Sequence, residues 1–169
     1  DSGIDINFRK NKNWIKSDTK RKGVIKGSRQ DDLLRSANKK PSIINDRQGD
    51  DIVIGNNSRQ TYKNGRGDDV LIGSGKRDIF EDGKGNDLMI AVSKNYKGNR
   101  ADRDLFKLGR GMNNIIADFN DKKDEFKILA GGEPSGYQDT SYGAFVSYKG
   151  GRTHFLGLDS DALSNRFTG

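Results

Sequence analysis

Single apolar residues recur in the middle of this chain at an interval of nine, each two positions after a polar residue. The pattern is clearest in GRGDDVLIGSGKRDIFEDGKGNDLMI, residues 65–90. The polar positions there are Asp69, Asp78 and Asp87, and the apolar residues that follow them are Leu71, Phe80 and Met89. A nine-residue unit has room for one strand of about three residues and one tight turn. Self-similarity at a fixed period predicts a solenoid of stacked strands.

The same frame extends in both directions along the chain. Towards the N-terminus, the polar position is held by Gln60, Asp51 and Ser42 and, after a one-residue insertion, by Asp32. Towards the C-terminus, after an insertion of eight residues, it is held by Asp104 and then by Asn113, which is followed by Ile115. We therefore predict an all-β fold, a right-handed parallel β-roll of nine-residue half-coils over residues 23–117. A basic arm (1–22) precedes it, and a β-rich cap (118–169) follows.

Two half-coils complete one coil, so alternate turns stack on opposite edges of the roll. The first edge, edge A, is expected to carry Asp32, Asp51, Asp69, Asp87 and Asn113. The second, edge B, is expected to carry Ser42, Gln60, Asp78 and Asp104. Carboxylates stacked at a strand spacing of about 4.8 Å repel one another, and a cation would relieve that repulsion.

Calcium suits such a site, because it accepts about six to eight oxygen ligands in flexible geometry and mixes carboxylates with main-chain carbonyls. Asp51, Asp69 and Asp87 are the predicted side-chain ligands, and Asp32 and Asn113 extend the row. The glycines expected to shape the turns and present carbonyls are Gly49, Gly65, Gly67, Gly83 and Gly85. On edge B, Asp78 and Asp104 are candidates for one further ion.

Two of the repeats, NGRGDDVLI and DGKGNDLMI, resemble the GGxGxDxUx nonapeptide of the RTX (repeat-in-toxin) family. The segments NNIIADFNDKKDEFKILAG and THFLGLDSDALSNRF are similar to the closing segments of such proteins. The resemblance covers about residues 24–169. It implies a parallel β-roll that holds calcium between stacked turns, in a protein that a bacterium exports to calcium-rich surroundings.

The turns of edge B depart from this pattern, since Arg59 and Arg77 occupy positions next to the row. We expect this edge to be poor in metal. Two interpretations of these arginines stay open: they neutralise the stacked carboxylates in place of a cation, or they extend into water.

The strands of edge A carry a second signal, because the residues on both sides of the buried one are apolar too. Side chains alternate across a strand, so the outer face of this sheet should present an apolar stripe. The stripe comprises Ile52, Ile54, Val70, Ile72, Leu88 and Ile90. Its cover could be the N-terminal arm, the C-terminal strands around Phe145 and Phe155, or a partner protein.

Charge is unevenly distributed along the chain. Residues 1–40 hold 12 Lys and Arg against 5 acids, and residues 41–91 hold 7 against 9. The basic arm predicts attraction to a polyanion, for which an acidic polysaccharide or a cell surface is favoured over nucleic acid. The arm residues expected to take part are Lys10, Lys12, Lys16, Lys20, Arg21 and Lys22.

No apolar run reaches the length of a membrane span, and there is no cysteine to form a disulfide or a thiolate site. The glycines form no phosphate-binding loop, no small-molecule substrate is evident from the sequence, and nothing near the one histidine, His154, suggests the partner of a catalytic dyad. We expect a calcium-stabilised, non-catalytic module. The alternatives are an ancillary module of an extracellular polysaccharide-active enzyme or protease, and a subunit that docks through the apolar stripe.

Overall fold

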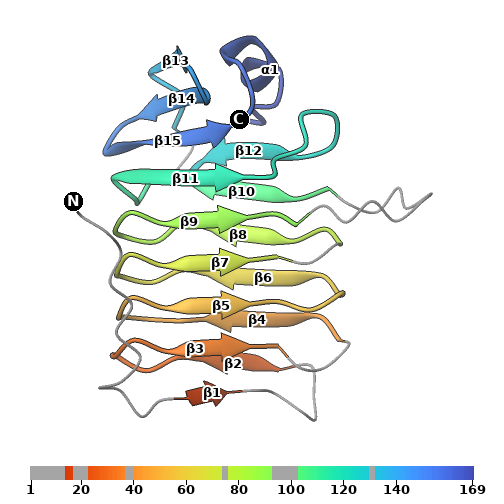
Figure 1. Ribbon diagram of the computed structural model, residues 1–169, viewed down its shortest axis with the longest axis vertical. Helices are drawn as coiled ribbons and strands as arrows, with labels where there is room; N and C mark the ends of the chain where they lie inside the picture. The colour runs from red at the N-terminus through yellow and green to blue at the C-terminus, as the bar shows by residue number, and fades with distance from the viewer. Residues whose placement is uncertain (1–13, 17–22, 37–39, 74–75, 93–102, 130–131) are drawn as a thin grey trace.

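The computed structural model describes residues 14–16, 23–36, 40–73, 76–92, 103–129 and 132–169 (Figure 1). Within these ranges the chain forms short strands and one short helix, α1 (Ser160–Ser164). Along the roll, consecutive strands alternate between two sheets, and each coil lies directly on the one before it. In Figure 1 the first strands lie at the bottom and the C-terminal strands at the top.

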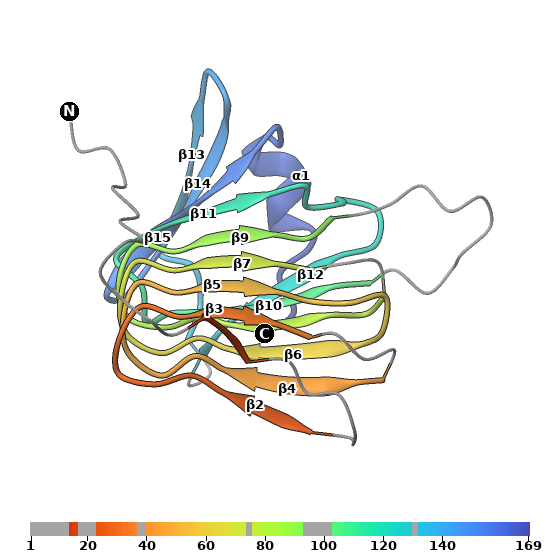
Figure 2. The same cartoon turned by 60° about the horizontal axis from the view of Figure 1, so that its bottom comes forward.

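The two sheets face each other across a single core (Figure 2). Sheet A contains, in spatial order, β1 (Trp14–Lys16), β3 (Leu33–Arg35), β5 (Ile52–Ile54), β7 (Val70–Ile72), β9 (Leu88–Ile90), β11 (Asn113–Ala117), β15 (Gly151–Leu156), β14 (Gly143–Tyr148) and β13 (Gly136–Thr140). Sheet B contains β12 (Glu125–Ile128), β10 (Leu105–Leu108), β8 (Ile79–Glu81), β6 (Gln60–Lys63), β4 (Ser42–Asn45) and β2 (Val24–Lys26). Neighbouring strands from β1 to β12 pair in parallel, which confirms the predicted β-roll.

From β2 to β12, each strand of the roll contributes its central apolar residue to the core. The inward residues that the nine-residue frame identified and that are buried are Leu34, Ile44, Val53, Tyr62, Leu71, Phe80, Met89 and Phe106. Three aromatic rings stack along sheet B: the centroids of Tyr62 and Phe80 are 4.6 Å apart, and those of Phe80 and Phe106 are 4.8 Å apart. These distances match the spacing of paired strands.

The last edge A unit differs from the frame by one residue. Asn114 and Ile116, instead of Asn113 and Ile115, occupy the inward positions, since Ile116 pairs with Met89. Ile116 is fully buried, whereas Ile115 is 39% exposed. The prediction for Asn113 was wrong because Ile116 follows the inward Phe106 by ten residues, whereas Met89 follows the inward Phe80 by nine.

The C-terminal strands extend the roll instead of covering it. β12 continues sheet B, and β15 pairs in parallel with β11 at the end of sheet A. β14 and β13 then add an antiparallel hairpin, against which α1 packs. Phe119, Phe126 and Phe155 close the core at this end. The C-terminal strands, one of the three possible covers of the apolar stripe, therefore lie at the end of sheet A and not over the stripe.

The N-terminal end of the described roll begins with β1, which pairs with β3 and falls within the segment predicted as an arm. In the part of the chain that the structure describes, no helix is long and apolar enough to cross a membrane.

Candidate metal centre on edge A

Each turn of edge A joins a sheet B strand to the following sheet A strand, and the turns lie directly on one another (left side of Figure 1). Gly67 shows how closely they approach. Its φ of +133° is unfavourable for any residue with a side chain, and a Cβ atom there would lie 2.0 Å from the carbonyl oxygen of Gly49. Gly49 and Gly85 repeat the positive φ one coil below and one coil above.

A ladder of buried side chains runs through these turns, which we call the inner ladder: Asp32, Asp51, Asp69, Asp87 and Asn114. Each main-chain N–H donates to the side-chain Oδ1 of the next coil. The N–O distances, in order, are 2.6, 2.7, 3.1 and 2.9 Å. The four predicted edge A aspartates are thus brought into one column, with Asn114 in the place expected for Asn113.

The second carboxylate oxygens of the inner ladder take no part in these hydrogen bonds. Oδ2 of Asp51, Asp69 and Asp87 is buried and has no hydrogen-bond partner. Within the described ranges, no Lys or Arg forms an ion pair with these carboxylates. Buried carboxylate oxygens without partners are rare, because each forfeits the hydration it would have in water. Their stacking one coil apart indicates a place where a cation fits.

A facing column, Asp46, Asn64 and Asp82, lies at the first position of the same turns and is also buried. Asp46 Oδ1 has no partner, and the amide nitrogen of Asn64 makes no hydrogen bond of normal geometry. This column was not predicted from the sequence, although its members are eighteen residues apart and follow the same repeat. Asp46 adds a further carboxylate to the interior of edge A.

Asp82 closes the column in another way. Its Oδ2 accepts hydrogen bonds from the main-chain N–H groups of Gly109, Arg110 and Gly111, at 2.9, 2.8 and 2.8 Å. Its Oδ1 accepts one from the side-chain nitrogen of Asn114 at 2.8 Å. At the last coil, protein donors thus satisfy both oxygens of the Asp82 carboxylate, so that it needs no cation.

The electrostatics of the interior oppose ionisation in the absence of a cation. Burial raises the pKa of Asp51 to about 9 and those of Asp69 and Asp87 to about 8, and neighbouring carboxylates raise them further. Burial also raises the pKa of Asp46 to about 7. A bound cation would reverse this preference, because it favours the charged form of each carboxylate.

The donor set consists of oxygen atoms, which suits a hard cation. Among the described residues, no three Asp, Glu, His or Cys side chains converge as a ligand group. A cation here would therefore bind one or two carboxylates of neighbouring coils, and turn carbonyls would complete its coordination. The predicted turn glycines, Gly49, Gly65, Gly67, Gly83 and Gly85, all lie in these stacked turns.

An outer ladder runs along the surface of edge A, one residue before the inner one: Asp31, Asp50, Asp68, Asn86 and Asn113. Here the main-chain N–H groups of Asp50, Asp68 and Asn86 donate to the side chain of the preceding coil, at 2.9, 2.8 and 2.8 Å. At the far end, Arg152 Nε donates to Asn113 Oδ1 at 3.0 Å. Unlike the inner ladder, these side chains are exposed to solvent.

Edge B contains a corresponding buried column of Gln60, Asp78, Asp104 and Asp124, joined by the same main-chain to side-chain bonds at 2.6–2.8 Å. Asp124 was not expected there. At the Gln60 level, the side-chain nitrogen donates to Asn56 Oδ1 at 2.8 Å and to the Ser58 carbonyl at 3.0 Å. The side-chain amide of Gln60 thus donates hydrogen bonds to oxygen atoms of that turn.

Arg59 and Arg77 are exposed, and neither forms an ion pair with the carboxylates of edge B in the described ranges. Of the two interpretations of these arginines, the structure favours extension into water.

Only some of the predicted partner-binding residues lie in the part of the chain that the structure describes. The six residues of the apolar stripe lie on the outer face of β5, β7 and β9 and are half-buried. Lys16 lies in β1, whereas Lys10, Lys12, Lys20, Arg21 and Lys22 lie outside the described residues.

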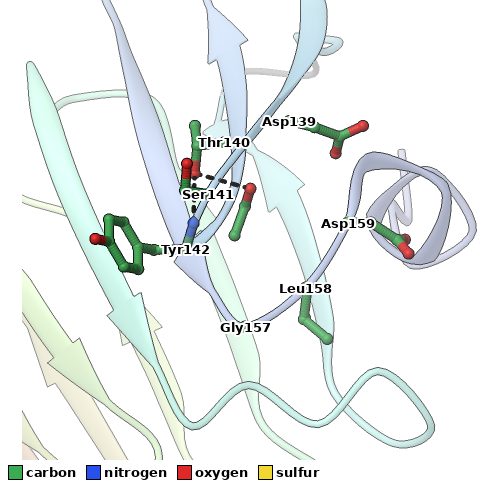
Figure 3. Close-up of a pocket in the computed structure, with 8 residues that line it drawn as sticks. Asp139, Thr140, Ser141, Tyr142, Gly157, Leu158 and Asp159 are labelled. Atoms are coloured by element: carbon green, nitrogen blue, oxygen red, sulfur yellow. Dashed lines mark hydrogen bonds between the residues drawn. The ribbon is translucent and has the colours of Figure 1, made fainter.

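A shallow hollow of about 370 Å³ lies at the cap, between the β13–β14 turn and the start of α1 (Figure 3). Its carboxylates already serve the fold: Asp139 accepts from the main chain and hydroxyl of Ser160, and Asp159 accepts from Ala162 N. His154 lies nearby, 3.1 Å from the Thr140 hydroxyl and stacked on Phe145.

Comparison with known proteins does not assign this chain to a family. No protein-family model matches the chain, and a search of curated proteins finds no match.

Proposed function

We propose that this chain is a calcium-stabilised, non-catalytic structural module of RTX type, belonging to an exported bacterial protein. The observation that carries the proposal is the column of unpartnered, buried carboxylate oxygens of Asp51, Asp69 and Asp87. Asp46 faces the same interior with an unpartnered oxygen of its own. These four side chains would hold calcium, with the turn carbonyls completing its coordination.

Calcium fits this arrangement better than magnesium does. Magnesium requires a near-ideal octahedron at about 2.0–2.1 Å, whereas calcium tolerates irregular sets of oxygens at about 2.3–2.6 Å. The inner ladder supplies a carboxylate at Asp51, Asp69 and Asp87 on three successive coils, and the facing column adds one at Asp46. Extracellular calcium-binding modules work at about 10⁻⁴–10⁻³ M calcium, and this agrees with export.

The role of the ion would be to couple binding to folding. Without it, ionised carboxylates at strand spacing oppose the stacking of coils. With it, each coil is joined to the next, and the binding free energy stabilises the folded roll.

A second candidate function, docking of a protein partner through the apolar stripe, is supported by the half-buried Ile, Val and Leu side chains on the outer face of sheet A. The ancillary role beside a catalytic domain is a third. The full-length gene separates it from the first, because it would encode an adjoining enzyme.

Equilibrium dialysis with calcium tests the proposed site. We expect the triple variant Asp51→Asn/Asp69→Asn/Asp87→Asn to lose most of its bound calcium. The matched control, Asp31→Asn/Asp50→Asn/Asp68→Asn, changes the same number of charges on the exposed outer ladder and should retain calcium binding. Equal calcium binding by both variants and the wild-type chain would exclude the inner ladder as the site.

A further inference from the structure

The position directly before the buried ladder residue has opposite character on the two edges. On edge A it is the outer ladder, made of Asp and Asn. On edge B the aligned residues are Pro41, Arg59, Arg77, Arg103 and Lys123, since the strands that follow them are paired in register. The last four form a basic row with one cation on each of four successive coils.

The basic row is available to a ligand. Arg59, Arg77 and Arg103 are exposed and Lys123 is half-buried. In the described ranges, the ion pairs of this protein involve Glu81 on the face of sheet B and none of these four residues. The exposed acids of the edge B turns that the structure describes are Asp118 and Asp121, both in the last turn. Lys40, Lys76 and Lys122 add positive charge to the same edge.

The residues of the basic row recur at a regular spacing because the coils of the roll are stacked in register. The stacked rings in the core give a coil repeat of 4.6–4.8 Å, so four coils span roughly 14 Å. We propose that edge B binds a linear acidic polysaccharide laid parallel to the roll axis, with its carboxylates on Arg59, Arg77, Arg103 and Lys123. This site deepens the proposed function, because it requires the folded roll, and it differs from the N-terminal arm considered from sequence.

The repeat and the chemistry of the row favour a polyuronate over nucleic acid. A 1,4-linked uronic acid polymer carries one carboxylate per sugar ring, so a short oligomer brings several carboxylates within the length of the row. A strand of duplex DNA carries a phosphate about every 3.4 Å. Single-stranded nucleic acid binds by stacking its bases on aromatic side chains. Among the described residues of edge B, no aromatic side chain is exposed.

The test is the binding of galacturonate oligomers to the full chain in calcium, measured by calorimetry. We expect affinity to rise from the dimer to the tetramer, because a tetramer spans the row, and to fall as salt rises. The variant Arg59→Gln/Arg77→Gln/Arg103→Gln should bind octagalacturonate about tenfold more weakly than the wild type. The matched control, Arg29→Gln/Arg66→Gln/Lys84→Gln, removes three exposed charges from edge A and should bind within about twofold of the wild type.

Equal losses in the two variants would reduce the interaction to net charge and overturn the inference. No loss in either variant, or no measurable binding of octagalacturonate to the wild type, would also overturn it. Tight binding of an oligothymidylate of the same charge would replace the polysaccharide with nucleic acid. Circular dichroism of each protein with and without calcium separates these results from a failure of the calcium site: edge B binding by a roll that folds without calcium would contradict the proposed function alone.

Discussion

At the scale of single residues, the two carboxylate oxygens of each inner-ladder aspartate have different fates. Oδ1 of Asp69 accepts the N–H of Asp51 and joins two coils, whereas its Oδ2 is buried without a partner. The first interaction stabilises the stack, and the second costs free energy unless a cation or a proton meets it. The stacking of coils uses only Oδ1 of Asp69. The unpartnered Oδ2 is therefore the reason why we propose that Asp69 binds a cation.

Gly67 offers a test of how tightly the edge A turns are stacked. We expect Gly67→Ala to destabilise the folded protein by at least about 1–3 kcal/mol, because of its positive φ and the clash with the Gly49 carbonyl. Gly136→Ala is the control, since a Cβ there meets nothing within 4 Å. Urea unfolding in calcium measures both, and similar stability of the two variants would contradict the observed stacking.

At the scale of elements, the nine-residue period predicted most of the strands and their inward residues. Val53, Leu71 and Phe80 could be placed from sequence because coil geometry dictates their spacing. The last edge A strand could not, because the inward residues of β10 and β11 are ten residues apart instead of nine, and periodicity does not show where an insertion lies. Asp124 was missed for a similar reason, since it lies twenty residues after Asp104.

The facing column was missed, and only Arg59 and Arg77 of the basic row were noted from sequence, for a different reason. The nine-residue frame was built on the residue two positions before each apolar one, and other positions of the repeat were not compared across all coils. Asp46, Asn64 and Asp82 recur at one such position, and Arg59, Arg77 and Arg103 at another. What sequence could not supply was the direction of these side chains, buried in the first case and exposed in the second.

The corrected register of β11 gives a prediction at this scale. Asn114→Ala would leave Asp87 N–H and Asp82 Oδ1 without their partners, so we expect a loss of about 1–3 kcal/mol in unfolding free energy. Asn113→Ala removes an exposed side chain and should cost less than about 0.5 kcal/mol. Thermal unfolding of both variants checks this. The reverse order of stability would restore the register that the sequence predicted.

At the scale of the whole molecule, the proposed calcium would compete with protons for the same carboxylates. The pKa values of Asp46, Asp51, Asp69 and Asp87 are raised in the fold to between about 7 and 9, from an ordinary value of 3.8. A raised pKa means that the folded state binds protons more tightly than the unfolded state does. The metal-free roll is thus stabilised in acid and loses that contribution as the pH rises through 7 to 9.

This linkage predicts that the stability of the metal-free protein falls as the pH rises. We expect the metal-free protein to show a melting transition at about pH 5.5 that shifts to lower temperature, or is lost, at about pH 9. The increase in melting temperature caused by calcium should be larger at the higher pH, because fewer protons must be displaced. Thermal scans by circular dichroism, with and without calcium, give both quantities. A metal-free melting temperature that rises with pH would contradict the burial of ionisable carboxylates in edge A.

The dependence of the roll on calcium can be decided by one measurement, far-UV circular dichroism of the exhaustively chelated protein titrated with calcium at slightly alkaline pH. We predict that the chelated chain has little β signal and gains it cooperatively as calcium is added, with magnesium much less effective. If the chelated chain already has its full β signal and the same melting temperature as in calcium, the inner ladder needs no cation, and the calcium-stabilised function is wrong.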